Sequence, residues 1–206
     1  MITTSEYRPS RSDRIGIWIF IVAGVAIVAW SAYAALMRVM QVLLGEDVPV
    51  LASFIETGAE APIGPDGALV PVTLDTAYVT AEQLPAASVV AAIIEPLVTF
   101  LAVAVVVVCL ILLARNTLRG RIFSRRNTAL ASTAGFTGLV GSALAPFFGN
   151  MVANGAVADI SDRTFDRTTV LSIEPFPYIL AAFAIAIVVT AFGIGDRLQR
   201  DAEGLV

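Results

Sequence analysis

The stretch LVTFLAVAVVVVCLILLA (residues 97–114) holds eighteen consecutive residues that carry no charge. Because an α-helix rises 1.5 Å per residue, this run alone nearly crosses the apolar core of a bilayer, which is roughly 30 Å thick. Arg115 follows the run and Glu95-Pro96 precede it, with further apolar residues back to position 86. The sequence therefore predicts a transmembrane helix over residues 86–114, in which Pro96 fits the start of the regular helix better than its middle.

Three other stretches have the same character. Residues 15–37, 129–148 and 177–195 are uncharged and have about the length that a membrane-spanning helix needs. The chain of 206 residues is 57% hydrophobic and only 15% charged, which leaves too little polar surface to coat a soluble fold. We therefore expect an all-α integral membrane protein with four transmembrane helices and a small extracytoplasmic β cap.

The first of these runs has a second interpretation. Trp18 near one end, and Trp30 and Tyr33 toward the other, suit the two headgroup layers of a membrane span. However, arginines precede the run, and Ala32-Tyr33-Ala34 has the small-x-small form that a signal peptidase accepts. A cleaved signal peptide is thus the alternative, although the apolar part of such a peptide is usually about 7 to 15 residues long, shorter than this run.

The third run, residues 129–148, is rich in small residues. Spacings of four, such as Gly138/Ser142 and Gly141/Ala145, let two helix backbones approach closely in a membrane. We expect this helix to form the interior seam of the bundle.

The arginines are distributed unequally between the segments that connect the runs. Ten of the thirteen lie in the two tails and the central loop: Arg8, Arg11, Arg14, Arg115, Arg119, Arg121, Arg125, Arg126, Arg197 and Arg200. The other three are Arg38, Arg163 and Arg167. Because basic residues near the ends of spans stay on the cytoplasmic side, this bias predicts a multi-pass protein of a bacterial cytoplasmic membrane with both termini in the cytoplasm. The predicted layout places residues 1–14, 115–128 and 196–206 in the cytoplasm and residues 38–85 and 149–176 outside.

The central loop, RNTLRGRIFSRRN (residues 115–127), predicts a tight helical hairpin. Gly120 fits the glycine that follows the end of one helix, and Ser124 fits the N-cap of the next. The arginines here serve first as a topological anchor on anionic lipid, which attracts each of them by about 1 kcal/mol. A specific contact with a protein or a nucleic acid is the alternative.

The carboxyl tail completes the cytoplasmic face. Its spacings Asp196/Arg200 and Arg197/Asp201 predict i,i+4 ion pairs, so we expect the fourth helix to extend into the cytoplasm and Leu198 to contact the rim of the hairpin. The candidate cytoplasmic interaction surface comprises Arg119, Gly120, Arg121, Phe123, Arg125, Arg126, Asn127, Arg197, Leu198 and Asp201.

The first outward segment, residues 41–85, carries seven acidic residues and no basic one. Within it a Pro-Asp-Gly turn precedes an alternation at Val70, Val72 and Leu74, which indicates a strand or hairpin. The second outward segment contains a similar short run, TTVLSI (residues 168–173), so we expect the two segments to pair into the β cap.

Glu95 is the one ionisable residue within an apolar run, a place where such residues often serve function. Counting back from Arg115 at 1.5 Å per residue places it about 30 Å away, near the outer edge of the membrane core. Arg38 ends the first span on the same side, so we expect an ion pair between Arg38 and Glu95. A role in transport or proton coupling, or a hydrated carboxylate without a partner, are the alternatives.

The residue inventory excludes many kinds of catalysis. The chain contains no His and no Lys, which removes histidine-ligated metals, serine–histidine pairs and Schiff-base lysines. The single Cys109 lies in an apolar run and is expected to be inert packing. A net charge of −4 argues against direct binding of nucleic acid. We expect a protein without enzymatic activity, cofactor or metal.

Two patches, LRGRIFSRRNTALASTAG (residues 118–135) and AFGIGDRLQRDAEGLV (residues 191–206), resemble the bacterial membrane-protein family catalogued as domain of unknown function two-nine-seven-five. The first looks like that family's glycine, aromatic-hydroxyl pair and asparagine opening a helix, with Asn127 in the asparagine position. Arg125 and Arg126 stand where the family more often has acids. The resemblance implies four spans with a cytoplasmic middle loop and no established activity. It also suggests one partner, a small helix-turn-helix regulator of the kind often encoded beside such proteins.

Together these features predict a bilayer-embedded sensory, regulatory or accessory protein that acts through a cytoplasmic partner, either that regulator or another membrane protein. A small transporter or pore that uses Glu95 is one alternative. A structural subunit of a larger membrane complex is the other.

Overall fold

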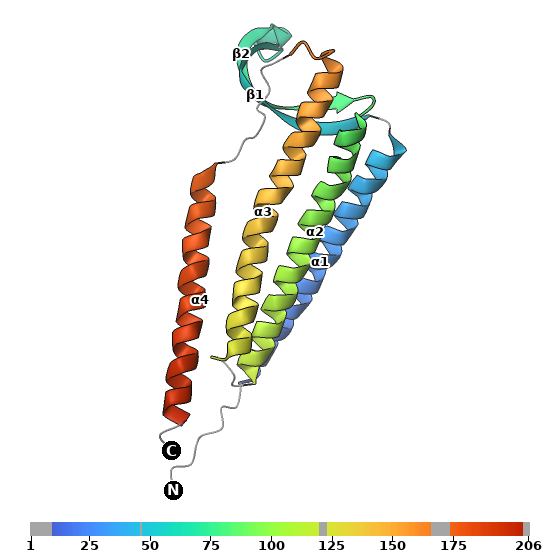
Figure 1. Cartoon of the computed structure of the whole chain (residues 1–206). Coiled ribbons are helices and arrows are strands. Elements are labelled where there is room, and N and C mark those ends of the chain that lie inside the picture. Colours follow the sequence, from blue (N-terminus) through green and yellow to red (C-terminus); the bar gives the residue numbers. More distant parts are fainter. Residues whose placement is uncertain (1–9, 46, 120–122, 166–173, 204–206) are drawn as a thin grey trace. The chain divides into compact units, whose positions relative to one another are not determined.

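The computed structural model describes residues 10–45, 47–119, 123–165 and 174–203 (Figure 1). The elements follow the order α1 (Arg11–Leu44), β1 (Val48–Ala61), a 3-10 turn (Pro65–Gly67), β2 (Val70–Ala81), α2 (Ala86–Leu118), α3 (Arg125–Ile160) and α4 (Pro175–Glu203). All four α-helices are long and apolar enough to cross a membrane, as the hydropathy of the sequence predicts.

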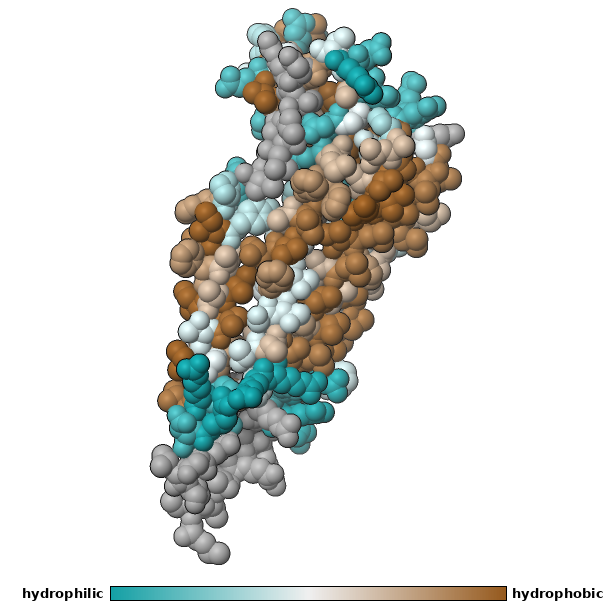
Figure 2. All heavy atoms as spheres, viewed as in Figure 1, coloured by the Kyte–Doolittle hydropathy of each residue, from teal (hydrophilic) through white to brown (hydrophobic). Residues whose placement is uncertain are grey.

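The apolar stretches of these helices are exposed along most of their length. Within the most apolar window of each helix, between none and 17% of the residues are buried inside the protein. Large side chains such as Trp18, Phe183 and Ile187 are about two-thirds exposed. Figure 2 shows apolar residues gathered along the helices and hydrophilic residues gathered on the hairpin and at the arginine-bearing helix ends. Surfaces of this composition are stable only in a lipid environment or against other apolar surfaces.

The chain divides into two compact units. The helical unit comprises residues 1–33, 100–141 and 174–206, and the hairpin unit comprises residues 34–99 and 142–173. Three helices, α1, α2 and α3, contribute residues to both units, whereas α4 belongs to the helical unit alone.

Small residues mediate the helix contacts of the helical unit. Gly24 of α1 faces Val107 of α2, where a β carbon would lie 2.9 Å from the valine methyl. On α3, Gly138 and Gly141 face α2, and Gly135 faces Ile185 of α4. Glycines therefore line α3 on the sides that meet α2 and α4, as the spacing of small residues predicts.

Helix α1 begins before its apolar run because its first turn is capped. The Ser10 hydroxyl accepts a hydrogen bond from the Asp13 amide at 3.2 Å, and the Asp13 carboxylate accepts one from the Ser10 amide at 2.8 Å. This reciprocal arrangement is a capping box, which satisfies two amides that the helix itself leaves unbonded.

The hairpin unit is built around an antiparallel pair, β1 and β2, joined by the predicted Pro-Asp-Gly turn. Val48, Val50 and Ala52 alternate along β1 and are all buried. They share one hydrophobic core with residues of α1, α2 and α3: Val42, Ala91, Ala92, Val152, Ala153, Ala156 and Val157. The predicted hairpin is therefore a packed part of the fold.

A register shift between Ser53 and Thr57 divides the hairpin. Within it Glu56 has a φ of 41°, a left-handed conformation that is uncommon for residues other than glycine. Residues 48–53 of β1 pair with residues 76–81 of β2, and residues 57–61 pair with residues 70–74. The bulge therefore separates a base that carries the buried residues from an outer ribbon.

Two details differ from the prediction. Helix α3 does not end at Phe148 but continues to Ile160, because Val152, Ala153, Ala156 and Val157 form an apolar face that packs in the hairpin unit. Helix α2 begins at Ala86, as predicted, but Pro96 lies inside the regular helix and not at its start. A proline inside a helix removes one backbone hydrogen bond, and the burial of Ala91 and Ala92 in the core stabilises the turns before it. The strand predicted over residues 168–173 lies outside the described residues.

Candidate functional site

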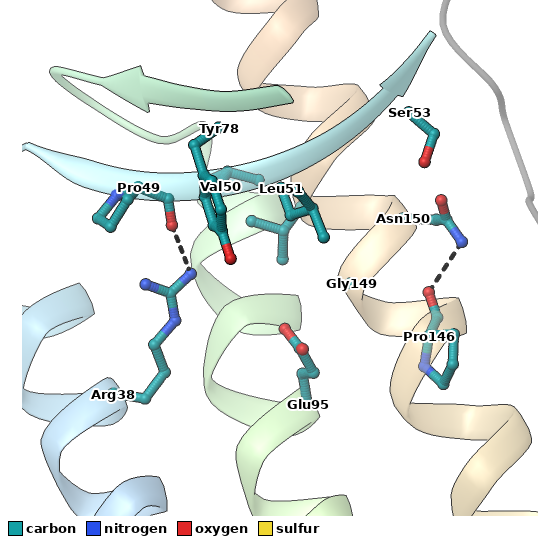
Figure 3. A pocket seen from close by; sticks show the side chains of 11 residues that line it. Arg38, Pro49, Val50, Leu51, Ser53, Tyr78, Glu95, Pro146, Gly149 and Asn150 are labelled. Atoms are coloured by element: carbon teal, nitrogen blue, oxygen red, sulfur yellow. Dashed lines mark hydrogen bonds between the residues drawn. The ribbon is translucent and has the colours of Figure 1, made fainter. Parts of the chain in front are cut away.

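A pocket of about 440 Å³ lies in the hairpin unit (Figure 3). It is lined by Arg38 of α1, Pro49, Val50, Leu51 and Ser53 of β1, Tyr78 of β2, Glu95 of α2, and Pro146, Gly149, Asn150 and Val152 of α3. Three helices and both strands therefore contribute to one cavity, and it brings Arg38 and Glu95 together as the sequence predicts.

The Arg38 guanidinium is held at the rim of this pocket by two acceptors. One terminal nitrogen donates to the backbone carbonyl of Pro49 at 3.0 Å, and the other donates to the Gln41 side-chain oxygen at 3.0 Å. These two bonds fix the position of the charge while leaving other N–H groups of the guanidinium to bind elsewhere.

The Glu95 carboxylate faces the backbone of α3. A β carbon placed on Gly149 would lie 3.5 Å from one carboxylate oxygen, so the absence of a side chain at Gly149 leaves room for the acid. The only bond made to Glu95 outside the regular helix pattern, among residues the structure describes, is from the Thr99 hydroxyl to the Glu95 backbone carbonyl. The carboxylate is thus half-buried and without a direct donor.

The predicted ion pair between Arg38 and Glu95 is not formed as a direct contact. Within the described parts of the chain, the only nitrogen–oxygen pair of opposite charge within 4.0 Å joins Arg200 and Asp196. Arg38 instead turns to Pro49 and Gln41, because β1 offers a carbonyl oxygen closer to the end of α1 (Figure 3).

Polar groups that the sequence did not single out complete the lining. Figure 3 shows the Tyr78 hydroxyl pointing toward the space between Arg38 and Glu95. The Asn150 amide nitrogen donates to the Pro146 carbonyl at 3.0 Å, which leaves the amide oxygen as an acceptor. Tyr78 is exposed for 77% of its surface, so its ring lies at the open side of the pocket.

The cytoplasmic candidate residues fall into two groups. Arg119, Arg125 and Arg126 are exposed, whereas Gly120 and Arg121 lie outside the described residues. Ser124 caps α3 as predicted, because its hydroxyl accepts a hydrogen bond from the Asn127 amide at 3.3 Å. The exposed arginines therefore stand at and beside the first turn of α3.

Asn127 is buried, which corrects its place in the predicted surface, whereas Phe123 is exposed for 40% of its surface and also contacts α4. Asn127 is 0% exposed, and its side-chain oxygen accepts a hydrogen bond from the Asn116 amide nitrogen at 2.7 Å, joining α2 to α3. The Phe123 ring lies against Gly195 and 5.9 Å from the Phe192 ring, joining the hairpin to α4. Both side chains hold helices together.

The end of α4 also differs in part from the prediction. Arg200 and Asp196 form the predicted ion pair at 2.6 Å. Arg197 and Asp201 are exposed and make no such pair in the part of the chain described. Leu198 is 64% exposed, because α4 contacts Phe123 through Phe192 and Gly195 instead. Of the predicted surface, the exposed members are Arg119, Phe123, Arg125, Arg126, Arg197, Leu198 and Asp201.

No group of three or more metal-ligating side chains occurs among the described residues. Comparison of the chain with family models, with curated proteins and with solved structures gives no match. The resemblance of residues 118–135 and 191–206 to a family thus stays an expectation from sequence. The pocket and the exposed basic residues are the features of this chain that bear on its function.

Proposed function

We propose that this chain is a multi-pass protein of a bacterial cytoplasmic membrane with both termini and the arginine-rich hairpin in the cytoplasm. The ten-to-three division of the arginines supports this orientation. The length and hydropathy of α1, α2, α3 and α4 support insertion in the bilayer. In this orientation the β1-β2 hairpin and its pocket face the outside of the cell.

We further propose a sensory or regulatory role. The pocket receives a signal outside, and the exposed arginines at the start of α3 and the end of α4 bind a soluble cytoplasmic partner. The observation that carries this proposal is the pocket itself, which holds a guanidinium and a carboxylate in one cavity without a direct bond between them. Since α1, α2 and α3 each contribute residues to both units, a change in the pocket can be transmitted along continuous helices.

A transporter that uses Glu95 is the second candidate, because this carboxylate lines the pocket. The glycines of α3 give it little support. Gly135, Gly138 and Gly141 face Ile185, Val106 and Ala102, so neighbouring side chains occupy the space that a pore along this face needs. Flux of protons or small ions into liposomes that contain the purified protein, abolished by Glu95→Gln, favours transport over sensing.

The experiment that tests the regulatory proposal is site-specific photo-crosslinking in intact cells. A crosslinking residue replaces Arg126 or Arg197, and a matched control replaces Glu82, which is exposed in the hairpin unit. We expect one soluble protein, a small helix-turn-helix regulator, to be captured at Arg126 and Arg197 and not at Glu82. Recovery of only lipid or of the same proteins at all three positions contradicts the proposal, and stable capture of a larger membrane complex favours a structural subunit.

A further inference from the structure

We infer that the pocket beside Arg38 and Glu95 binds a small zwitterion, a molecule that carries one oxyanion, carboxylate or phosphate, and one ammonium group. This inference deepens the proposed function, since it names the chemical class of the signal. It rests on the placement of two opposite charges in one cavity of about 440 Å³.

Arg38 is placed to bind the oxyanion. Its two bonds to Pro49 and Gln41 hold the guanidinium in position without neutralising it, because both acceptors are uncharged. A guanidinium presents five N–H donors in a planar fork that fits carboxylate and phosphate oxygens. A positive charge that is fixed in position and lacks a direct counterion is suited to an anionic ligand.

Glu95 is placed to bind the ammonium group. Its carboxylate lies beside the bare backbone of Gly149 and receives no hydrogen bond from any described residue. Asn150 and Tyr78 line the same cavity and carry neutral oxygen acceptors, and the Tyr78 hydroxyl points toward the space between Arg38 and Glu95 (Figure 3). An ammonium group has three donors and no acceptor, so a carboxylate in a cavity with neutral oxygens matches it.

The charge balance of the pocket disfavours simpler ligands. A lone anion attracted by Arg38 is repelled by Glu95, and a lone cation attracted by Glu95 is repelled by Arg38. A divalent metal needs several oxygen ligands of negative or neutral character, and a single carboxylate beside a guanidinium is a poor set. A ligand with both charges matches both side chains. The pocket volume of about 440 Å³ lies in the lower part of the range of about 300–1,000 Å³ common for ligand pockets, so the ligand is small.

Two sources supply this chemistry. One is a free solute such as an amino acid, and the other is the headgroup of a zwitterionic phospholipid, whose phosphate and ammonium are adjacent. Apart from Ser53, the remaining lining is apolar and includes Val50, Leu51 and Val152, so the pocket accepts an aliphatic substituent from either source. The experiment must therefore offer the protein both a free zwitterionic solute and a zwitterionic lipid.

The test uses the full chain in nanodiscs of phosphatidylglycerol, which has no ammonium group. Calorimetric titration with O-phosphoethanolamine and β-alanine measures binding of the free zwitterion, and acetate and ethanolamine provide probes with one charge. We expect one of the zwitterions to bind, and Arg38→Gln and Glu95→Gln each to weaken that binding about tenfold or more, as expected for loss of a charged hydrogen bond. Glu82→Gln removes an exposed carboxylate of the same unit and serves as the control.

The single-charge probes distinguish direct binding from damage to the fold. Acetate is expected to bind Glu95→Gln more tightly than the parent protein, and ethanolamine to bind Arg38→Gln more tightly, because each substitution removes a repulsion. A misfolded variant cannot gain affinity for a ligand. A second variant tests the pocket without changing its charge. Gly149→Leu fills the space beside the Glu95 carboxylate and is expected to abolish zwitterion binding.

The lipid arm replaces half of the phosphatidylglycerol with phosphatidylethanolamine. A rise in thermal stability that is lost in both charge variants, with no binding of the free solutes, assigns the site to the lipid headgroup. Absence of binding in both arms, or binding that changes less than twofold in both charge variants, overturns the inference. Neither result alters the crosslinking pattern at Arg126 and Arg197, so failure of this inference and failure of the regulatory proposal are separately visible.

Discussion

Three glycines on α3 give a graded prediction for helix packing. A β carbon at Gly141 would overlap the β carbon of Ala102 on α2, whereas one at Gly138 would lie 3.6 Å from a Val106 methyl, an ordinary van der Waals distance. Gly135 resembles Gly141, since a β carbon there would lie 2.5 Å from one carbon of Ile185 and 3.3 Å from the branched carbon. Substitution by alanine therefore tests the three contacts with the same added methyl group.

The change in the free energy of unfolding for each substitution is the sum of two opposing effects. Alanine favours the helix over glycine by about 1 kcal/mol at each position. Overpacking a close contact costs roughly 1–3 kcal/mol. The propensity gain cancels between the variants, so Gly141→Ala is expected to be about 2 kcal/mol less stable than Gly138→Ala. For a chain of this size that difference corresponds to roughly 4–8 °C in Tm.

The assay is thermal unfolding of the purified variants in one detergent, followed by circular dichroism and by the fluorescence of the two tryptophans. Gly138→Ala is expected to unfold at or above the temperature of the parent protein, and Gly141→Ala and Gly135→Ala below it. Equal unfolding temperatures for the three variants would refute the packing assigned to α2, α3 and α4. Gly16, which has no atom within 4 Å of an added β carbon, provides the baseline.

Three further substitutions test the contacts near the start of α3 and the end of α4. Asn127→Ala leaves the Asn116 amide without its buried partner and is expected to lower the free energy of unfolding by about 1–3 kcal/mol. Replacing both Asn116 and Asn127 by alanine is expected to destabilise the protein less than the sum of the two single substitutions, and a double-mutant cycle measures this coupling. Ser124→Ala removes the cap of α3 and is expected to cost about 1 kcal/mol in the same unfolding assay, with no loss if the cap is unimportant. Asp196→Asn breaks the pair with the half-exposed Arg200 and is expected to change stability by less than about 1 kcal/mol, so a much larger loss would show that this pair has a role beyond the helix surface.

The four long helices were predictable because lipid imposes a simple rule. A helix that crosses a membrane needs about 20 apolar residues, and such runs are visible without any knowledge of contacts. The outer end of α3 was missed for the same reason. Residues 149–160 include Asn150, Asn154 and Asp159, which reads as a polar loop, but their apolar face packs on the hairpin and not on lipid.

The pocket was only partly predictable. The position of Glu95 one span length from Arg115 placed it near Arg38, and the structure puts both at one cavity. The competing acceptor on Pro49 depends on how β1 returns over the end of α1, which residue spacing does not specify. Tyr78 enters through its pairing with Leu51, and that register depends on the whole length of the hairpin.

The segment between α2 and α3, predicted to be cytoplasmic, shows the opposite error. Asn127 is polar and close to arginines, so the sequence suggests exposure, but it is buried against Asn116 eleven positions earlier. Two amide side chains at the facing ends of two apolar helices were a signal for such a pair. Phe123 likewise contacts Gly195, far away in sequence, a contact that no local pattern reports.

The outer ribbon of the β hairpin has a consequence for the solubility of the protein. A two-stranded sheet has an unpaired edge on each strand, which invites other chains to add as further strands. Here Pro71 removes one edge amide, and the exposed carboxylates of Glu56, Glu60 and Asp75 give neighbouring copies the same sign of charge. Mutual repulsion between these acids thus keeps the ribbons of adjacent molecules from joining edge to edge, and neutralising them would be expected to start aggregation at this tip.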